Sequence, residues 1–364
     1  MGSLPVTNAE SSKDSRDGLT PWRLDIPERQ TSVVVLSFRE KNAKLLYSFI
    51  SNEDKVMKIA IIGIGGVGGY YGGKLATHYG DHNDVEVTFI ARGEHLKEIQ
   101  KKGLKLITNE GTFIAKPDKT TDNPANCGIF DLVLFCVKSY DLDHGAKLLY
   151  ENISEKTVVI SLLNGVDNHD RLVSVLPNAH ILNGCVYISA YIEKPGTVRK
   201  VSGSCKLFFG DEYGKFDDRF KIDQIFIDAT IKAEYRKDIN DIVWEKYVFI
   251  SPLASVTAFQ SKTFGEIMDD AESKKLLEGL LKEVELVGRA QGANLPNNIC
   301  QRSLDKISLF PYDTKSSMQV DFEKNRKTEI ETFTGYIVKT AKDYGLEAPL
   351  HEMIYRSLLN SVHP

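Results

Sequence analysis

Several features that would place this 364-residue sequence in a specialised class are missing from it. There is no run of about 18 apolar residues, so no transmembrane helix is expected. The five cysteines are scattered without C-x-x-C spacing, and the eight histidines form no H-E-x-x-H pair. These absences argue against a disulfide framework and the common zinc motifs. We therefore predict reduced thiols, as in a cytoplasmic protein, and no bound metal.

An excess of basic residues is also missing. Lysine and arginine total 46 and aspartate and glutamate total 50, which gives a formal net charge of −4. General nucleic-acid binders usually present a strongly basic face, so neither a nucleic acid nor a membrane is expected as a partner. The length suffices for two domains with a large hydrophobic core.

Residues 1–56 differ in composition from the rest of the chain. Residues 1–29 are rich in serine, aspartate, asparagine, proline and arginine and show almost no hydrophobic periodicity. Such a composition cannot bury enough apolar surface to offset chain entropy. We predict an extension that is disordered or not native to the folded protein. The alternative is a functional arm.

The chain is organised around the stretch that follows, residues 57–73. Residues 58–62 form a β-branched run that predicts a buried parallel strand, and residues 67–79 have a helical pattern. The turn between them fits G-x-G-x-x-G and reads Gly63-Ile64-Gly65-Gly66-Val67-Gly68. Strand, glycine turn and helix in this order predict a dinucleotide site with the pyrophosphate on the helix N-terminus. A glycine-rich turn that binds nothing is the alternative.

Each of three glycines in this turn has its own predicted role. Gly63 permits the tight turn, Gly65 lets the backbone approach a pyrophosphate, and Gly68 lets the helix pack closely on the strand.

Arg92 follows the next predicted strand, residues 85–91. An acidic residue usually stands there in NAD-binding proteins, whereas an arginine suits the 2′-phosphate of NADP. The sequence therefore favours NADP, although Glu94 is close and a surface arginine is the alternative.

Polar residues follow two further predicted strands. Lys138 comes directly after residues 131–137, and Asn164 with Gly165 comes after residues 157–163. Open α/β sheets bind ligands at the carboxyl ends of their strands, so we predict that Lys138 and Asn164 lie at a ligand-binding edge. A plain Asn-Gly turn is the alternative at Asn164.

Helical periodicity replaces strand signals near Asp238. Before it, a hairpin is predicted at 104–115, a meander that closes the sheet at 181–209, and a helix at 217–233. We predict an α/β fold with two domains after the extension: a dinucleotide-binding domain at 57–238 and an all-helical substrate and catalytic domain at 239–364.

Two charged residues of the helical half are candidates for chemistry. Lys246 lies in a very apolar segment, where a lysine needs a carboxylate partner, a lowered pKa or a chemical role. Pro252 is expected to kink or end this helix. Glu329 lies in a helix predicted at 327–343. A lysine that reaches water along its stem and a solvated glutamate are the simpler interpretations of these two residues taken alone.

Over residues 57–364 the chain resembles the ketopantoate reductase family, the NADPH-dependent enzymes of pantothenate biosynthesis. The matching pieces stand in the family's order: Gly63 to Gly68, Arg92, Val137-Lys138, Asn164-Gly165, Trp244-Glu245-Lys246, Ser316-Ser317-Met318 and Thr328-Glu329-Ile330.

The resemblance implies a Rossmann-type domain followed by a helical one, NADPH as cofactor, and reduction of 2-dehydropantoate (ketopantoate) to pantoate. Lys246 would be the proton donor, and Glu329 an active-site carboxylate that orients it. Asn164 would lie by the nicotinamide and the substrate, and Ser317 would hold the substrate carboxylate. The cofactor contacts implied are Gly63, Ile64, Gly65, Gly66, Val67, Gly68, Arg92, Lys138, Asn164, Ala190 and Glu329.

The chain departs from the family at Ile250 and Ala254, one and two turns after the lysine, where the family carries substrate-binding asparagines. Ser251 and Ser255 are adjacent and could replace them, although they are one residue out of helix phase. Two alternatives stay open: an NADP-dependent 2-oxoacid or 3-hydroxyacid oxidoreductase with another substrate, and a non-catalytic NADP-binding sensor. The partner expected is a small 2-oxoacid, with the chain as a monomer or homodimer.

Overall fold

The structure, a computed structural model, describes residues 56–211 and 219–362. Except for Val56, the predicted N-terminal extension lies outside the described residues. The described residues form a sheet part, Val56 to Tyr235, and a helical part, Ile239 to Val362.

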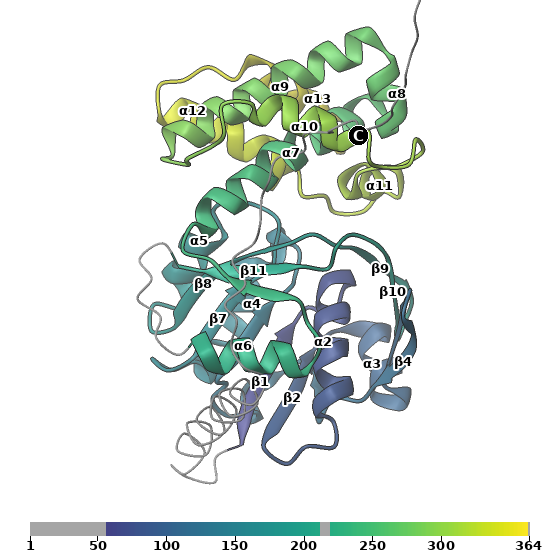
Figure 1. Ribbon diagram of the computed structural model, residues 1–364, viewed down its shortest axis with the longest axis vertical. Coiled ribbons are helices and arrows are strands. Elements are labelled where there is room, and N and C mark those ends of the chain that lie inside the picture. Colours follow the sequence, from purple (N-terminus) through teal and green to yellow (C-terminus); the bar gives the residue numbers. More distant parts are fainter. Residues whose placement is uncertain (1–55, 212–218, 363–364) are drawn as a thin grey trace, which may run out of the picture. The chain divides into compact units, whose positions relative to one another are not determined.

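An eight-stranded sheet with the order β12-β11-β8-β7-β6-β1-β2-β5 forms the centre of the sheet part (Figure 1). The strands from β5 to β8 are mutually parallel, and β11 pairs antiparallel with β8. The bounds are β1 Met57–Ile62, β2 Val85–Ile90, β5 Lys119–Thr121, β6 Leu132–Phe135, β7 Val158–Ser161, β8 His180–Val186, β11 Leu207–Gly210 and β12 Ala233–Tyr235.

The apolar run of β1 is explained by cores on both faces of this sheet. Ile59 and Ile61 belong to one core, whereas Ala60 and Ile62 belong to another. Because successive side chains of a strand point to opposite faces, a strand covered on both sides is apolar at every position. Helices α2 (Gly66–Tyr79) and α6 (Arg219–Asp228) contribute to the first core, and α4 (Leu142–Leu148) and α5 (Asn168–Val175) to the second.

A second sheet, with the order β4-β3-β10-β9, covers the other side of α2. The predicted hairpin at 104–115 is confirmed, but the prediction that residues 181–209 close the large sheet is wrong for β9 and β10. The reason is tertiary packing: Val198 of β10 is fully buried, and a Cβ on Gly69 of α2 would lie 2.6 Å from its Cγ2. The bounds are β3 Leu104–Thr108, β4 Gly111–Ala115, β9 Ser189–Lys194 and β10 Thr197–Ser202.

Three helix predictions need correction. Helix α6 ends at Asp228, and residues 233–235 form β12, which pairs with β11. The helix predicted from 327 begins later, with a π-helical turn at Glu331–Gly335 followed by α12, so Glu329 precedes it. Pro252 does not end helix α7, which continues through it to Gln260, so of the predicted kink or end the end is wrong. A proline costs a helix about 3 kcal/mol, and burial of the residues on both sides of it offsets this.

The helical part is built around α7, which contacts the π turn and helices α8, α9, α10, α11 and α13. Its bounds are α7 Ile239–Gln260, α8 Phe264–Asp269, α9 Ala271–Ala290, α10 Ile299–Ile307, α11 Ser317–Glu323, α12 Tyr336–Asp343 and α13 Pro349–Val362. The predicted fold class, α/β followed by helices, is confirmed. The domain boundaries themselves stay a prediction. Among the described residues, no helix combines the length and apolar character that crossing a bilayer requires.

Candidate active site

The glycine turn has the geometry that the sequence predicts. Gly63 has a φ of +91°, which favours glycine, and a Cβ on Gly68 would lie 2.0 Å from the Gly63 carbonyl oxygen. A Cβ on Gly65 would meet no atom within 4 Å. Gly63 and Gly68 are therefore required by the fold, whereas Gly65 faces open space at the N-terminus of α2.

The backbone of β9 lies against this turn. A Cβ on Gly66 would lie 2.0 Å from the carbonyl oxygen of Ala190, so only glycine fits at that position. This places Ala190, a predicted cofactor contact, beside the turn. Ile64 and Val67 stand in the same turn and the first residues of α2.

Arg92 lies at the carboxyl end of β2, directly before α3 (Gly93–Lys102). Its side chain is 77% exposed, and Nη2 lies 2.7 Å from Oδ2 of Asp141. An exposed ion pair of this kind contributes about 0–1 kcal/mol. The guanidinium can therefore exchange Asp141 for a more highly charged anion at little cost.

Lys246, on α7, meets Asn164 from the carboxyl side of β7. Its ammonium donates a hydrogen bond of 2.7 Å to the Asn164 side-chain oxygen. Burial lowers the pKa of Lys246, and the Cys185 thiol and the Glu329 carboxylate only partly offset that effect. The structure thus brings together two predicted site residues that are 82 positions apart.

Glu329 binds Lys138 instead of orienting Lys246. Its carboxylate accepts a hydrogen bond of 2.7 Å from the Lys138 ammonium and one of 3.3 Å from the Ser139 backbone N–H. Asp321 accepts a second bond of 3.2 Å from Lys138. The predicted Glu329–Lys246 pairing is therefore replaced, because Lys138 reaches Glu329 from the end of β6.

The two lysines have opposite electrostatic environments. Burial alone would lower the pKa of Lys138, but Glu329 and Asp321 outweigh it and the pKa is raised. Among the residues that the structure describes, none forms an ion pair with Lys246, and burial lowers its pKa. Titratable groups whose environments separate their pKa values commonly divide the roles at an active site. Lys138 is suited to remain charged and Lys246 to release a proton.

Sequence reasoning missed three residues that connect these groups: Ser139, Asp321 and Thr332. The Thr332 hydroxyl bonds the Ser139 hydroxyl, and a Cβ on Gly165 would lie 3.0 Å from Thr332 Cγ2. Ser139 follows Lys138 directly, which is a usable signal. Asp321 and Thr332 offer no comparable local signal, because their partners are distant in sequence.

The three serines considered as substrate contacts, Ser251, Ser255 and Ser317, differ in burial. Ser251 and Ser255 are fully buried, and their hydroxyls bond the Phe333 carbonyl and the Thr334 hydroxyl at 2.8 Å each. The interpretation that they replace the family's asparagines is therefore wrong, because helix phase turns them toward the π turn. Ser317 is exposed at the first residue of α11, a helix that packs on α7.

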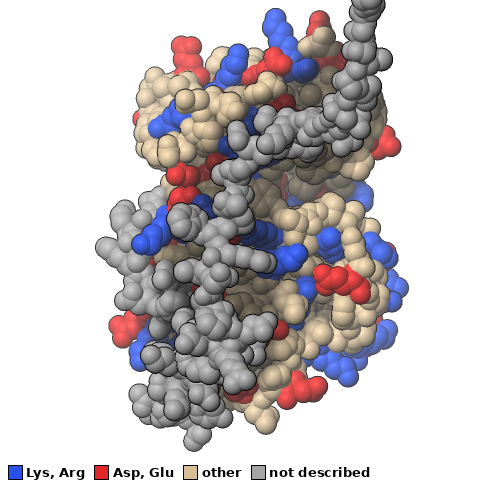
Figure 2. All heavy atoms as spheres, in the orientation of Figure 1, with Lys and Arg blue, Asp and Glu red and all other residues tan. Residues whose placement is uncertain are grey.

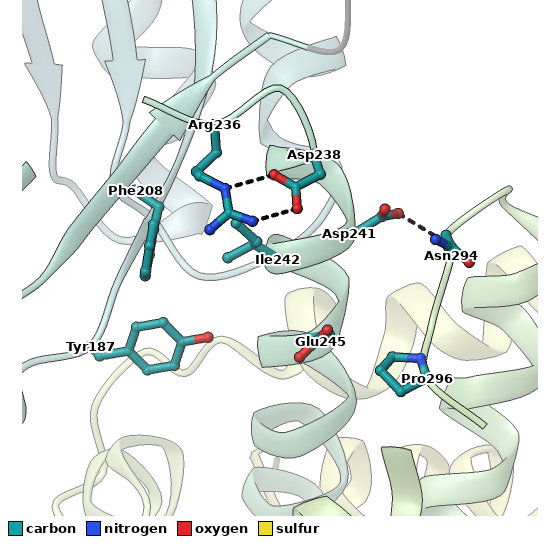
Figure 3. Close-up of a pocket in the computed structure, with 9 residues that line it drawn as sticks. All are labelled: Tyr187, Phe208, Arg236, Asp238, Asp241, Ile242, Glu245, Asn294 and Pro296. Carbon is teal, nitrogen blue, oxygen red and sulfur yellow. Dashed lines mark hydrogen bonds and ion pairs between the residues drawn. The ribbon is translucent and has the colours of Figure 1, made fainter. Parts of the chain in front are cut away.

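A larger cavity of about 460 Å³ lies at the start of α7 (Figure 3). Its charged residues already have partners: Arg236 donates two hydrogen bonds to Asp238, and Asp241 accepts one of 2.8 Å from the Asn294 backbone. Glu245 lies 3.4 Å from Arg302. On the face shown in Figure 2, acidic and basic side chains are interspersed. Neither this cavity nor the charge distribution on that face indicates another site, so the Lys246–Asn164 group remains the candidate site.

Comparison with known proteins agrees with this geometry. The family model "Ketopantoate reductase PanE/ApbA" matches residues 59–212, and "Ketopantoate reductase PanE/ApbA C terminal" matches residues 238–361. The chain belongs to the ketopantoate reductase family. It is thus an oxidoreductase of that family, and the predicted resemblance is confirmed.

Individual known proteins are similar to this chain over most of their own length. The crystal structure of 2-dehydropantoate 2-reductase from Porphyromonas gingivalis W83 is 34% identical with a TM-score of 0.73, covering 84% of this chain and all (100%) of that one. "2-dehydropantoate 2-reductase" from Nostoc is 26% identical over 83% of this chain and 94% of its own. "Uncharacterized oxidoreductase YkpB" from Bacillus subtilis is 27% identical over 83% and 98%.

The lowered pKa of Lys246 predicts the pH dependence of the rate. If the ammonium supplies the proton, kcat for reduction should fall as pH rises through its pKa, which lies below the ordinary 10.5. The measurement is kcat at saturating cofactor and substrate between about pH 6 and 11. A rate that is constant to the alkaline end of that range would contradict the assignment.

Proposed function

We propose that this protein is an NADPH-dependent reductase of 2-oxoacids, with 2-dehydropantoate, reduced to pantoate, as the leading candidate substrate. The observation that carries the proposal is the contact of Lys246 with Asn164, in which burial lowers the pKa of the lysine. Such a lysine at the ligand-binding edge of an α/β sheet is suited to acid catalysis.

The residues present fit NADPH. The open space in front of Gly65, at the N-terminus of α2, suits a pyrophosphate, and the exposed Arg92 suits a 2′-phosphate. Lys138, Asn164, Ala190 and Glu329 would complete the site. When bound, NADPH supplies the hydride that reduces the ketone carbon.

The protein's own contribution is the proton and its placement. Lys246 would donate a proton to the ketone oxygen as negative charge develops there, and would recover one from water. Asn164 holds the ammonium in place through its side-chain oxygen. Ser317 would bind the substrate carboxylate. Lys138 keeps the Glu329 carboxylate paired, so that the buried charge beside the site is compensated.

A different 2-oxoacid is the second candidate, and one observation favours it. Ile250 and Ala254 offer no hydrogen bond, and the neighbouring Ser251 and Ser255 hydroxyls are used inside the protein. Cytoplasmic location, the absence of nucleic-acid and membrane partners, and a monomer or homodimer remain parts of the proposal.

NADPH oxidation with ketopantoate and a panel of 2-oxoacids tests the function. Turnover with ketopantoate supports the leading candidate, and turnover only with another acid supports the second. NADPH binding without turnover on any 2-oxoacid would contradict both and leave the sensor alternative.

Cofactor choice is tested at Arg92. Arg92→Asp should raise the KM for NADPH roughly 10- to 100-fold, because hydrogen bonds to charged groups contribute about 1.5–3 kcal/mol. The KM for NADH should change much less, since NADH carries no 2′-phosphate. Arg356→Asp, which removes another highly exposed arginine paired with a carboxylate, is the control. Equal effects of Arg92→Asp on both cofactors would exclude the 2′-phosphate role.

A further inference from the structure

Apart from Lys246 and Asn164 themselves, the side chains next to these two residues are mostly apolar. A narrow cavity of about 10 Å³ adjoins both residues and is lined by Leu163, Cys185, Val243, Tyr247 and Ile250. A cavity of this volume holds about one water molecule. A substrate whose ketone oxygen reaches Lys246 must therefore hold its side group outside this cavity, against those of its lining residues that are partly exposed.

Ile250 is the wall residue best placed to meet that side group. It lies four residues after Lys246 on α7, one turn along the same helix face. It lines the same cavity and is partly exposed, whereas Ala254, a further turn along, is only 3% exposed. The substrate side group would thus meet a branched aliphatic chain first.

Two buried hydroxyls on α7, close in sequence to Ile250, are already hydrogen-bonded inside the protein. Tyr247 donates to the Thr332 carbonyl at 2.5 Å, and Ser251 donates to the Phe333 carbonyl at 2.8 Å. Both carbonyls belong to the π turn at Glu331–Gly335, which packs on α7. Releasing either hydroxyl would leave a buried carbonyl with one partner fewer, so neither is free to bind a ligand.

We propose that this surface selects 2-oxoacids whose side group carries no hydrogen-bonding substituent, and that Ile250 sets the preference. The inference rests on the reductase chemistry of the proposed function and favours its second candidate, a 2-oxoacid other than ketopantoate. A substrate hydroxyl placed against Ile250 gives up its hydrogen bonds to water and gains none. Ketopantoate carries such a hydroxyl at C4, and 3,3-dimethyl-2-oxobutanoate is the same molecule without it.

The decisive experiment compares these two acids with NADPH and the wild-type protein. The hydroxyl-free acid should have the higher kcat/KM, by about 10- to 100-fold, since an apolar wall rejects an added hydroxyl only moderately. A site built to bind the hydroxyl would instead favour ketopantoate by about 10⁴-fold or more. Preference for ketopantoate overturns the inference and leaves the proposed function standing.

Two variants test the role of Ile250. Ile250→Asn supplies an amide at this position and should reduce or reverse the preference. Ile250→Leu changes shape without polarity and should retain it. If Ile250→Asn keeps the wild-type ratio while both variants have wild-type melting temperatures, Ile250 does not set the preference.

Calorimetry of the two product 2-hydroxyacids tests the surface without turnover. 2-Hydroxy-3,3-dimethylbutanoate should bind more tightly than pantoate, and Ile250→Asn should narrow the difference. Tighter binding of pantoate would overturn the inference even if no acid is reduced. Tighter binding of the hydroxyl-free acid without any turnover would uphold the inference about the surface and refute the reductase.

Discussion

Lys246→Met is expected to lower kcat by about 10²–10⁴-fold, the usual contribution of a positioned proton donor, while the NADPH dissociation constant stays unchanged. Methionine keeps the apolar stem and removes the ammonium. Because burial already disfavours the charge on Lys246, the variant should fold with wild-type stability or better. The measurements are steady-state NADPH oxidation and fluorescence titration of NADPH.

Lys306→Met is the matched control for this prediction. Lys306 is also a partly buried lysine whose pKa burial lowers, and its ammonium lies over the Phe249 ring, 5.9 Å from the centroid. Its kcat should stay within a few-fold of wild type. If Lys246→Met turns over normally, Lys246 is not the acid; if both variants lose activity equally, the loss reflects general electrostatics.

Gly65→Ala should abolish most NADPH binding without weakening the fold. The added Cβ meets no protein atom within 4 Å, and Gly65 has a φ of −82°, which alanine adopts freely. Stability should be unchanged or raised by up to about 1 kcal/mol. Affinity should fall on the order of 100-fold, from the loss of one or two charge-assisted hydrogen bonds of about 1.5–3 kcal/mol each.

Gly68→Ala provides the opposite case in the same turn. Its Cβ would lie 2.0 Å from the Gly63 carbonyl oxygen, so the fold must shift, at a cost of about 1–3 kcal/mol. The melting temperature should fall even without cofactor. Differential scanning fluorimetry and NADPH titration separate the two variants. Wild-type NADPH affinity in Gly65→Ala would contradict placement of the pyrophosphate at this turn.

Local features of the chain could be predicted from the sequence. The strand that ends at Ile62, the turn and the helix that follows depend on residues within a few positions of one another, and the described geometry of Gly63 and Gly68 agrees with them. The polar residues at strand ends, Lys138 and Asn164, were also predictable, because parallel strands bring their carboxyl ends to one edge.

Partners distant in sequence could not be predicted in the same way. Lys138 and Glu329 are 191 positions apart, and no local pattern indicates that Lys138 rather than Lys246 reaches the carboxylate. The second sheet was missed for a similar reason, since β10 pairs with β3 across a long separation. The partners of Ser251 and Ser255 could not be predicted either, because the position of a serine on a helix does not show which groups of distant segments face it.

The uninterrupted course of α7 has a mechanical consequence. Lys246 lies seven residues after Ile239, about 10 Å along the axis, whereas Gln260 lies about 31 Å along it. A pivot just before the helix would therefore move the far end about three times as far as Lys246. A rotation about that point would displace Lys246, close to the fulcrum, less than any residue further along α7.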